Sequence, residues 1–292
     1  MLSTVKASDS MKGIMAMVVA TLLLTLNDTV TKLLTEDYSV WQVLALRHLF
    51  SLGVIVPYIH FYPGWDEMRI TNRAGMAARS MFFAATTVFI VIGFSVLPLA
   101  LVTAIAFSSP IFVVAFSHFF TSEKVGSRRW LAVFAGFVGV LMIVRPGSAA
   151  FEYILIFPVL AALCAGGRDV VTRGLSKTES SISILLWSNL AVVAVALVAT
   201  TLLGWKSITL GVAAFFLLNG LLSASAHFLI IDALRLGDAS LVSPFRYSGL
   251  LWATILGLLV WGDFPDTWTL AGAALLVASG LYILERSPRA AK

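Results

Sequence analysis

The segments "LVTAIAFSSPIFVVAFSHFFTSE" (residues 101–123) and "LVSPFRYSGLLWATILGLLVWGD" (residues 241–263) decide the fold, because they align with each other without a gap at an offset of 140 residues. A nearly equal offset places "DTVTKLL" (28–34) on "DVVTRGL" (169–175). Apolar segments resemble one another by composition alone, but a nearly constant offset across several segments is a stronger signal. The pattern predicts that the chain is an internal duplication.

The composition predicts a membrane protein. Of the 292 residues, 59% are hydrophobic and 12% are charged, and the mean hydropathy is +0.95, whereas soluble domains carry about 25% charged residues. Apolar runs of about 20 residues recur, and each is long enough to cross about 30 Å of hydrocarbon as a helix. We predict an all-α integral membrane protein with ten transmembrane helices, at about 11–34, 40–62, 74–97, 99–121, 129–146, 152–174, 181–203, 211–234, 239–261 and 267–284.

The duplication divides these spans into two predicted repeats of five, residues 1–146 and 147–292. Because five is odd, the second repeat enters the membrane from the opposite side, so the two are inverted. This architecture is common in secondary transporters, whose substrate site lies near the midplane where the repeats meet. We therefore expect two inverted repeats around a central cavity, and one chain as a complete, monomeric transport unit.

The net charge of +5 indicates topology rather than a nucleic-acid partner. With the N-terminus inside, three basic residues lie outside, namely Lys32, Arg145 and Lys206. Fourteen lie inside: Lys6, Lys12, Arg69, Arg73, Arg79, Lys124, Arg128, Arg129, Arg173, Lys177, Arg235, Arg286, Arg289 and Lys292. This positive-inside bias predicts a multi-pass protein of the cell inner (plasma) membrane with both termini cytoplasmic.

The sequence lacks the motifs that mark several other classes of function. There is no Walker A pattern, HExxH motif or metal-like His/Cys cluster, so we predict no cofactor and no metal. The single cysteine, Cys164, excludes an intrachain disulfide. Ser223 and His227 fall on one helix, whereas an intramembrane serine protease needs its serine and histidine on facing helices. A channel is a further alternative, but no filter-like loop or ring of acids is present.

Several motifs resemble the EamA family, the ten-helix members of the drug/metabolite transporter superfamily. In the first half these are "VLALRHLFS" (43–51), "SSPIFVVAFSHFFTSEKV" (108–125) and "RWLAVFAGFVGVLMIV" (129–144). In the second half "WGD" (261–263) and "AGAALLVASGLYIL" (271–284) repeat the close of the pattern. The resemblance implies a central cavity and transport by alternating access.

The resemblance also suggests a substrate class. We expect a secondary transporter that exports small metabolites, with amino-acid exporters of the YddG type, for aromatic or other hydrophobic amino acids, as the nearest branch. That choice rests on the family as a whole, and a general drug or nucleotide-linked metabolite carrier is the alternative. In one departure the position of Pro110 falls at Leu250, which predicts that the second half lacks the kink expected at the proline.

Charged residues inside the predicted spans require partners, because an unpaired charge costs about 2.5–3.5 kcal/mol at a helix centre on insertion scales. Asp28 and Arg47 lie at similar depth and are predicted to pair, as a gate or cavity wall. Asp169 and Arg246 are predicted to pair nearer the opposite face. In the alternative interpretation, Asp28 pairs with Lys32 one turn away. Asp28 and Asp169 are candidate proton sites, but coupling to protons is left open.

A cavity for an amino acid needs a few polar groups among apolar and aromatic walls. Arg246 is a candidate for the carboxylate, and Tyr247 offers a ring and a hydroxyl. His227 is a candidate pH sensor, or a neutral histidine bonded to a neighbouring helix. Pro110 is a candidate hinge, and a fixed kink is equally compatible. The predicted substrate-binding residues are Asn27, Ser80, Phe83, Ser109, His227, Arg246, Tyr247 and Trp252, of which Phe83 and Trp252 have packing as their alternative role.

Small residues are predicted to form close helix contacts. Ala135 and Gly139 in the fifth span, and Ala274 and Ala278 in the tenth, are spaced as small-xxx-small faces.

Overall fold

The computed structural model describes residues 2–62, 64–120, 127–145, 152–175, 178–236 and 243–285, and every regular element within them is a helix. The first half contains α1 (Leu2–Asp37), α2 (Val40–Phe61), η1 (Trp65–Met68), α3 (Arg73–Val96), α4 (Leu99–Ala106), α5 (Ser109–Phe120) and α6 (Ser127–Val144). The second contains η2 (Tyr153–Leu155), α7 (Ile156–Leu175), α8 (Ser181–Leu203), α9 (Leu210–Leu236), η3 (Ser243–Tyr247), α11 (Ser248–Trp261) and α12 (Thr267–Glu285). The predicted all-helical fold is confirmed.

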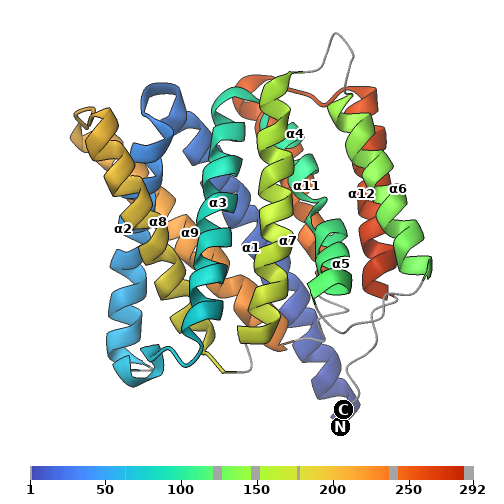
Figure 1. Ribbon diagram of the computed structural model, residues 1–292, viewed down its shortest axis with the longest axis horizontal. Helices are drawn as coiled ribbons and strands as arrows, with labels where there is room; N and C mark the ends of the chain where they lie inside the picture. Colours follow the sequence, from blue (N-terminus) through green and yellow to red (C-terminus); the bar gives the residue numbers. More distant parts are fainter. Residues whose placement is uncertain are drawn as a thin grey trace.

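The described helices account for all ten predicted spans. Seven segments are long and apolar enough to cross a membrane, and three shorter apolar helices occupy the places of the fifth, ninth and tenth spans. The start of α1 and the end of α12 lie at the same end of the bundle (Figure 1), as an even number of spans requires. Which side of the membrane that end faces stays a prediction.

The packing of the helices follows the internal repeat. Helices at equivalent places in the two halves pack on each other: α2 on α8, α4 on α11, and α6 on α12. The remaining pairs exchange partners, so that α1 packs on α9 while its counterpart α7 packs on α3. Figure 1 shows α2 with α8 at one side of the bundle and α6 with α12 at the other. This exchange is the pattern that a two-fold relation between the halves produces.

The fourth span is broken rather than continuous. α4 ends at Ala106, a turn covers Phe107 and Ser108, and α5 begins at Ser109. Pro110 has no N–H, and its ring would clash with the carbonyl four residues earlier, so a helix is kinked or broken at this point. The Ser108 hydroxyl and N–H instead donate to the Ile105 carbonyl, at 2.7 and 3.0 Å. The proline therefore produces a full break where the sequence predicted a kink.

The ninth span has no break at Leu250, as the absence of a proline there predicted, because α11 runs from Ser248 to Trp261. Just before α11, a 3₁₀ turn gives way to α-helix between Tyr247 and Ser248. Pro244 lies within that 3₁₀ turn and lacks an N–H. A different proline thus accompanies a change of helix type in the second half.

A close backbone contact joins α6 to α12. A Cβ on Gly272 would lie 2.6 Å from the Gly139 carbonyl oxygen, and a Cβ on Gly139 would lie 2.9 Å from the Gly272 carbonyl oxygen. Glycine is needed at both places because the backbones themselves are in contact. The expected face of Ala274 and Ala278 is wrong, since both side chains are exposed. The spacing of small residues predicted close helix contacts for α6 and α12, but it placed the contact on the wrong side of α12.

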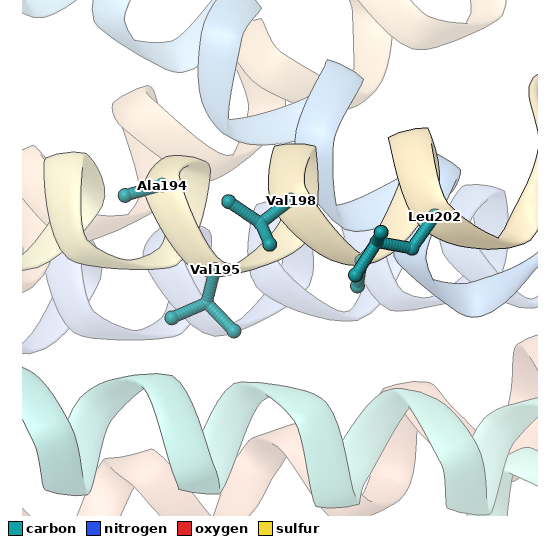
Figure 2. A pocket seen from close by; sticks show the side chains of 5 residues that line it. Ala194, Val195, Val198 and Leu202 are labelled. Carbon is teal, nitrogen blue, oxygen red and sulfur yellow. The ribbon is translucent and has the colours of Figure 1, made fainter.

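The outer surface is apolar, as a bilayer requires. A shallow groove on α8 is lined by Ala194, Val195, Val198, Ala199 and Leu202, and the labelled side chains follow one side of the helix (Figure 2). All five side chains are hydrocarbon, and Leu202 is 80% exposed. Such a groove suits acyl chains and offers no group that could orient a polar ligand.

Candidate functional site

A buried polar network joins the two halves between α1 and α9. The Asn27 amide N–H donates to the Asn219 backbone carbonyl at 2.9 Å and also to the Asn219 side-chain oxygen. The Asn219 amide in turn donates to the Thr31 hydroxyl at 3.0 Å, and that hydroxyl donates to the Asn27 carbonyl at 2.8 Å. Asn27 and Thr31 are four residues apart on α1 and so share one helix face. Because unpaired polar groups are costly in an apolar interior, these contacts fix α1 against α9.

The network continues through Arg47 on α2. Its Nη1 lies 3.4 Å from the Thr31 hydroxyl, and its Nη2 lies 3.1 Å from His48 Nε2. The other ring nitrogen, Nδ1, lies 2.7 Å from Asn189 Oδ1 on α8. The Asn189 amide N–H donates to the Leu185 carbonyl at 2.8 Å, which identifies Oδ1 as an acceptor. His48 therefore donates from Nδ1 and accepts from Arg47 at Nε2, which makes it a neutral imidazole.

Asp28 lies beside this network but outside its hydrogen bonds. Its side chain is partly buried, and it lies on α1 three residues before Thr31, whose hydroxyl contacts Arg47. Among the described residues the two form no ion pair, so the predicted direct pairing is not seen. The alternative partner is also occupied, because the Lys32 ammonium donates to the carbonyls of Phe94 and Leu97, at 3.2 and 2.8 Å.

A second cationic group lies on α3. The Arg79 guanidinium donates to the Ser188 hydroxyl and, at 3.3 Å, to the Ile184 carbonyl of α8. Its guanidinium carbon lies 5.0 Å from the centre of the Phe83 ring, which in turn packs edge-on against His48 at 6.0 Å. Ser80 lies 3.5 Å from the Ser188 hydroxyl. Phe83 thus contacts both Arg79 and His48, and Ser80 lies beside the serine that Arg79 bonds.

Asp169 has a different partner from the predicted one. Its carboxylate accepts from Nε and Nη2 of the adjacent Arg168, both at 2.9 Å. The predicted pair with Arg246 does not form, because Arg246 lies exposed on the 3₁₀ turn η3. Because Arg168 is adjacent in the sequence, it can reach the carboxylate however the helices pack. The prediction compared only depths in the membrane and did not consider this neighbour.

His227 on α9 donates from Nδ1 to the Ser223 carbonyl one turn earlier, at 2.8 Å. The expected bond to a neighbouring helix is therefore replaced by one within α9.

The other predicted binding residues lie around the break in the fourth span. Ser109 and Pro110 open α5, and Tyr247 packs edge-on against Phe107 with ring centres 5.4 Å apart. The Tyr247 hydroxyl and the Trp252 indole N–H are buried without a hydrogen-bond partner among the described residues. No described contact joins Tyr247 or Trp252 to the network, so their predicted roles in binding stay predictions.

The end of the bundle opposite the start of α1 is held together by polar contacts. The Lys32 ammonium lies 5.1 Å from the centre of the Trp261 ring, whose indole N–H donates to Glu36 at 2.8 Å. The Gln42 amide donates to the Lys206 carbonyl at 2.8 Å and accepts from the Lys206 N–H at 3.0 Å. These contacts link the end of α1 to α11, and the start of α2 to the segment before α9.

Sequence reasoning missed several members of the network. Thr31, His48, Asn189 and Asn219 were not singled out, although an asparagine inside an apolar span is itself a signal for an interhelical hydrogen bond. Arg79 was counted among the basic residues of one membrane face, but it lies seven residues into α3. A search for every strongly polar residue within the spans would have found all five.

Comparison with known proteins identifies a family that the chain matches. The model of the EamA-like transporter family matches residues 11–145 and 152–284. A solved crystal structure superposes with a TM-score of 0.64 over 95% of this chain and 97% of that chain, at 17% identity. A likeness at that identity supports the fold alone.

Curated relatives match over most of the chain. A protein of Rickettsia bellii named as an S-adenosylmethionine uptake transporter is 28% identical over 90% of both chains. A riboflavin transporter of Rhizobium johnstonii is 28% identical over 98% of this chain and 95% of its own. A pseudopaline exporter of Pseudomonas aeruginosa is 29% identical over 63% of this chain and 65% of its own.

Proposed function

Because the chain belongs to the EamA-like transporter family, we propose that it carries a small polar metabolite with a flat heteroaromatic ring across the membrane by alternating access. The observation that supports this proposal is the polar network of Asn27, Thr31, Arg47, His48 and Asn219. It is buried where helices of the two halves meet, which is where inverted-repeat transporters bind their substrates.

The names of the relatives support the substrate class. S-adenosylmethionine and riboflavin, named for two of them, both join a nitrogen-containing ring system to a polar chain. The network supplies polar partners for such a chain, and Phe83 supplies an aromatic wall beside it. These names favour the alternative expectation of a metabolite carrier, and they give no specific support to amino-acid export by a YddG-type protein.

The direction of transport is a separate part of the proposal. One relative is named for uptake and another for export, so export stays a prediction. Accumulation of substrate by whole cells that express the protein would contradict export, and faster loss of preloaded substrate would support it.

The test is counterflow in proteoliposomes. Vesicles that contain the purified protein are loaded with unlabelled S-adenosylmethionine, riboflavin or phenylalanine, and uptake of the labelled compound is compared with protein-free vesicles. We expect exchange of at least one of the two ring-bearing metabolites. Asn219→Leu is expected to abolish it, while Leu202→Ala on the lipid-facing groove leaves it unchanged. Monodisperse elution of each variant shows that it is folded.

Two results would overturn the proposal in different ways. Exchange of phenylalanine alone would reject the metabolite class and restore amino-acid transport. No exchange of any of the three compounds by folded protein would reject this substrate range altogether. Arg246→Ala tests the separate prediction that Arg246 binds the carboxylate of the substrate. If that prediction is right, the variant loses exchange.

A further inference from the structure

Arg47 within the network and Asp28 beside it carry opposite charges and retain unused hydrogen-bonding capacity. The Asp28 carboxylate accepts no hydrogen bond within the described part of the chain, and it forms no ion pair there. Arg47 is 6% exposed, and its Nε is buried without a partner among the described residues. Asp28 lies three residues before Thr31 on α1, so the two share one side of the helix, and the Thr31 hydroxyl lies 3.4 Å from Arg47 Nη1. Ionised groups within a membrane domain are costly and mark substrate or ion pathways.

Two nitrogens of the Arg47 guanidinium have hydrogen-bond partners and the third, Nε, has none among the described residues. Thr31 and His48 occupy Nη1 and Nη2, and Asn189 holds His48 in the tautomer that accepts from Arg47. Neither neighbour carries a negative charge, so the network orients the cation without neutralising it. Lys32 is bound to the carbonyls that end α3, and Asp169 is bound to Arg168. Both are therefore engaged elsewhere rather than at Asp28 or Arg47.

We propose that Asp28 and Arg47 together bind an α-amino-acid group of the substrate, with Asp28 binding the ammonium and Arg47 the carboxylate. An α-amino acid carries these two charges on a single carbon, in the complementary order. A guanidinium is the side chain best suited to a carboxylate, because its planar N–H groups match the geometry of the two oxygens. Asp28 supplies acceptors for the three N–H groups of an ammonium.

This inference rests on the proposed function and narrows it. Of the two metabolites from which the proposed substrate class is drawn, S-adenosylmethionine carries an α-amino-acid group and riboflavin does not. The assignment therefore selects S-adenosylmethionine or a similar amino-acid conjugate. It differs from the expected gate, in which Asp28 and Arg47 bind each other and the substrate binds elsewhere.

The test removes each charge from the ligand and from the protein in turn. Binding of S-adenosylmethionine and of its decarboxylated form to the purified full-length protein is measured by competition against labelled S-adenosylmethionine. For the wild type we expect the decarboxylated form to bind roughly 10- to 100-fold more weakly, the size of one charge-assisted hydrogen bond. This comparison requires no variant, so it holds even where a substitution disturbs folding.

The variants then identify the partner of each group. Arg47→Gln is expected to weaken the binding of S-adenosylmethionine by the same factor and to leave the binding of the decarboxylated form unchanged. Arg47→Lys is expected to restore part of the affinity for S-adenosylmethionine. Asp28→Asn is expected to weaken the binding of S-adenosylmethionine and to leave the binding of a deaminated analogue unchanged. Leu202→Ala is the control and should match the wild type for every ligand.

Each alternative has its own outcome. Equal weakening of S-adenosylmethionine and its decarboxylated form in Arg47→Gln would overturn the inference and support a gating or structural pair. Exchange of riboflavin without binding of S-adenosylmethionine would also overturn it, while the proposed function would stand. No binding or exchange of either metabolite by folded protein would reject the proposed function itself.

Discussion

The ring of Phe107 packs edge-on against the ring of Tyr247, with centres 5.4 Å apart, and the two residues occupy equivalent places in the internal repeat. Their numbers differ by 140, the offset that aligns the two halves. Phe107 lies in the turn between α4 and α5, and Tyr247 ends the 3₁₀ turn before α11. The irregular points of the fourth and ninth spans therefore meet, as residues close to a two-fold axis must.

The aromatic contact predicts a measurable coupling. Edge-to-face pairs contribute about 0.5–1.5 kcal/mol beyond the area they bury. In a cycle of Phe107→Leu, Tyr247→Leu and the double variant, we expect the losses in unfolding free energy to fall short of additivity by about that amount. Denaturant titration of the purified protein measures it. Additive losses would show that the rings are neighbours without a specific interaction.

The contact of α6 with α12 predicts that Gly272 tolerates no larger residue. A Cβ there would lie 2.6 Å from the Gly139 carbonyl oxygen, so Gly272→Ala is expected to destabilise the protein by about 1–3 kcal/mol through overpacking. Gly211, near the start of α9, has no atom within 4 Å of an added Cβ. Gly211→Ala is the matched control, and its melting temperature should equal or exceed that of the wild type. Equal melting temperatures for the two variants would contradict the assignment of the close contact.

Glu179 closes the end of the bundle where α1 begins. One of its carboxylate oxygens accepts from the N–H groups of Thr71 and Asn72, at 2.8 and 2.7 Å, just before α3, and the side chain is 7% exposed. Glu179→Ala would remove the acceptor of two partly buried hydrogen bonds, at an expected cost of about 0.5–1.5 kcal/mol for each bond. Thermal unfolding in detergent measures the loss. Glu67→Ala, at an exposed residue of η1, is the control and should change little.

Asp266 predicts a dependence of stability on pH. Its carboxylate accepts the Thr269 N–H at 2.7 Å at the start of α12 and pairs with Arg145, and these contacts hold the pKa of Asp266 below its ordinary value. Because the folded pKa is lowered, the stabilisation is present above the unfolded pKa of about 3.9. It is lost as the pH falls through the folded pKa. Melting temperatures of the wild type should converge on those of Asp266→Asn as the pH drops below 4. A constant difference between them would contradict this origin.

Much of the fold followed from the sequence alone. The spacing of the apolar runs predicted the ten spans, and the constant offset predicted two related halves. Both signals arise because lipid requires every span to be a self-bonded apolar helix, so that length and composition are nearly sufficient. Pro110 likewise predicted an irregularity in the fourth span, because a proline acts on its own helix.

The partners of the polar residues could not be predicted in this way. Equal depth in the membrane suggested that Asp169 pairs with Arg246, but the structure pairs Asp169 with the adjacent Arg168. Depth fixes one coordinate of a side chain, whereas an ion pair also depends on the rotation of each helix and on which helices are neighbours. The same limitation hid the chain of contacts from Asn189 through His48 to Arg47.

The sequence by itself determined that this protein is a helical membrane protein built from two related halves, because hydropathy and repetition are properties of the chain alone. Only the tertiary structure decided that Asn27 bonds Asn219, that Lys32 caps α3 instead of pairing with Asp28, and that Phe107 meets Tyr247. The physical reason is that lipid drives each span to become a helix independently of the others. The choice of contacts between helices depends on short-range packing and hydrogen bonds, which exist only after the spans have assembled.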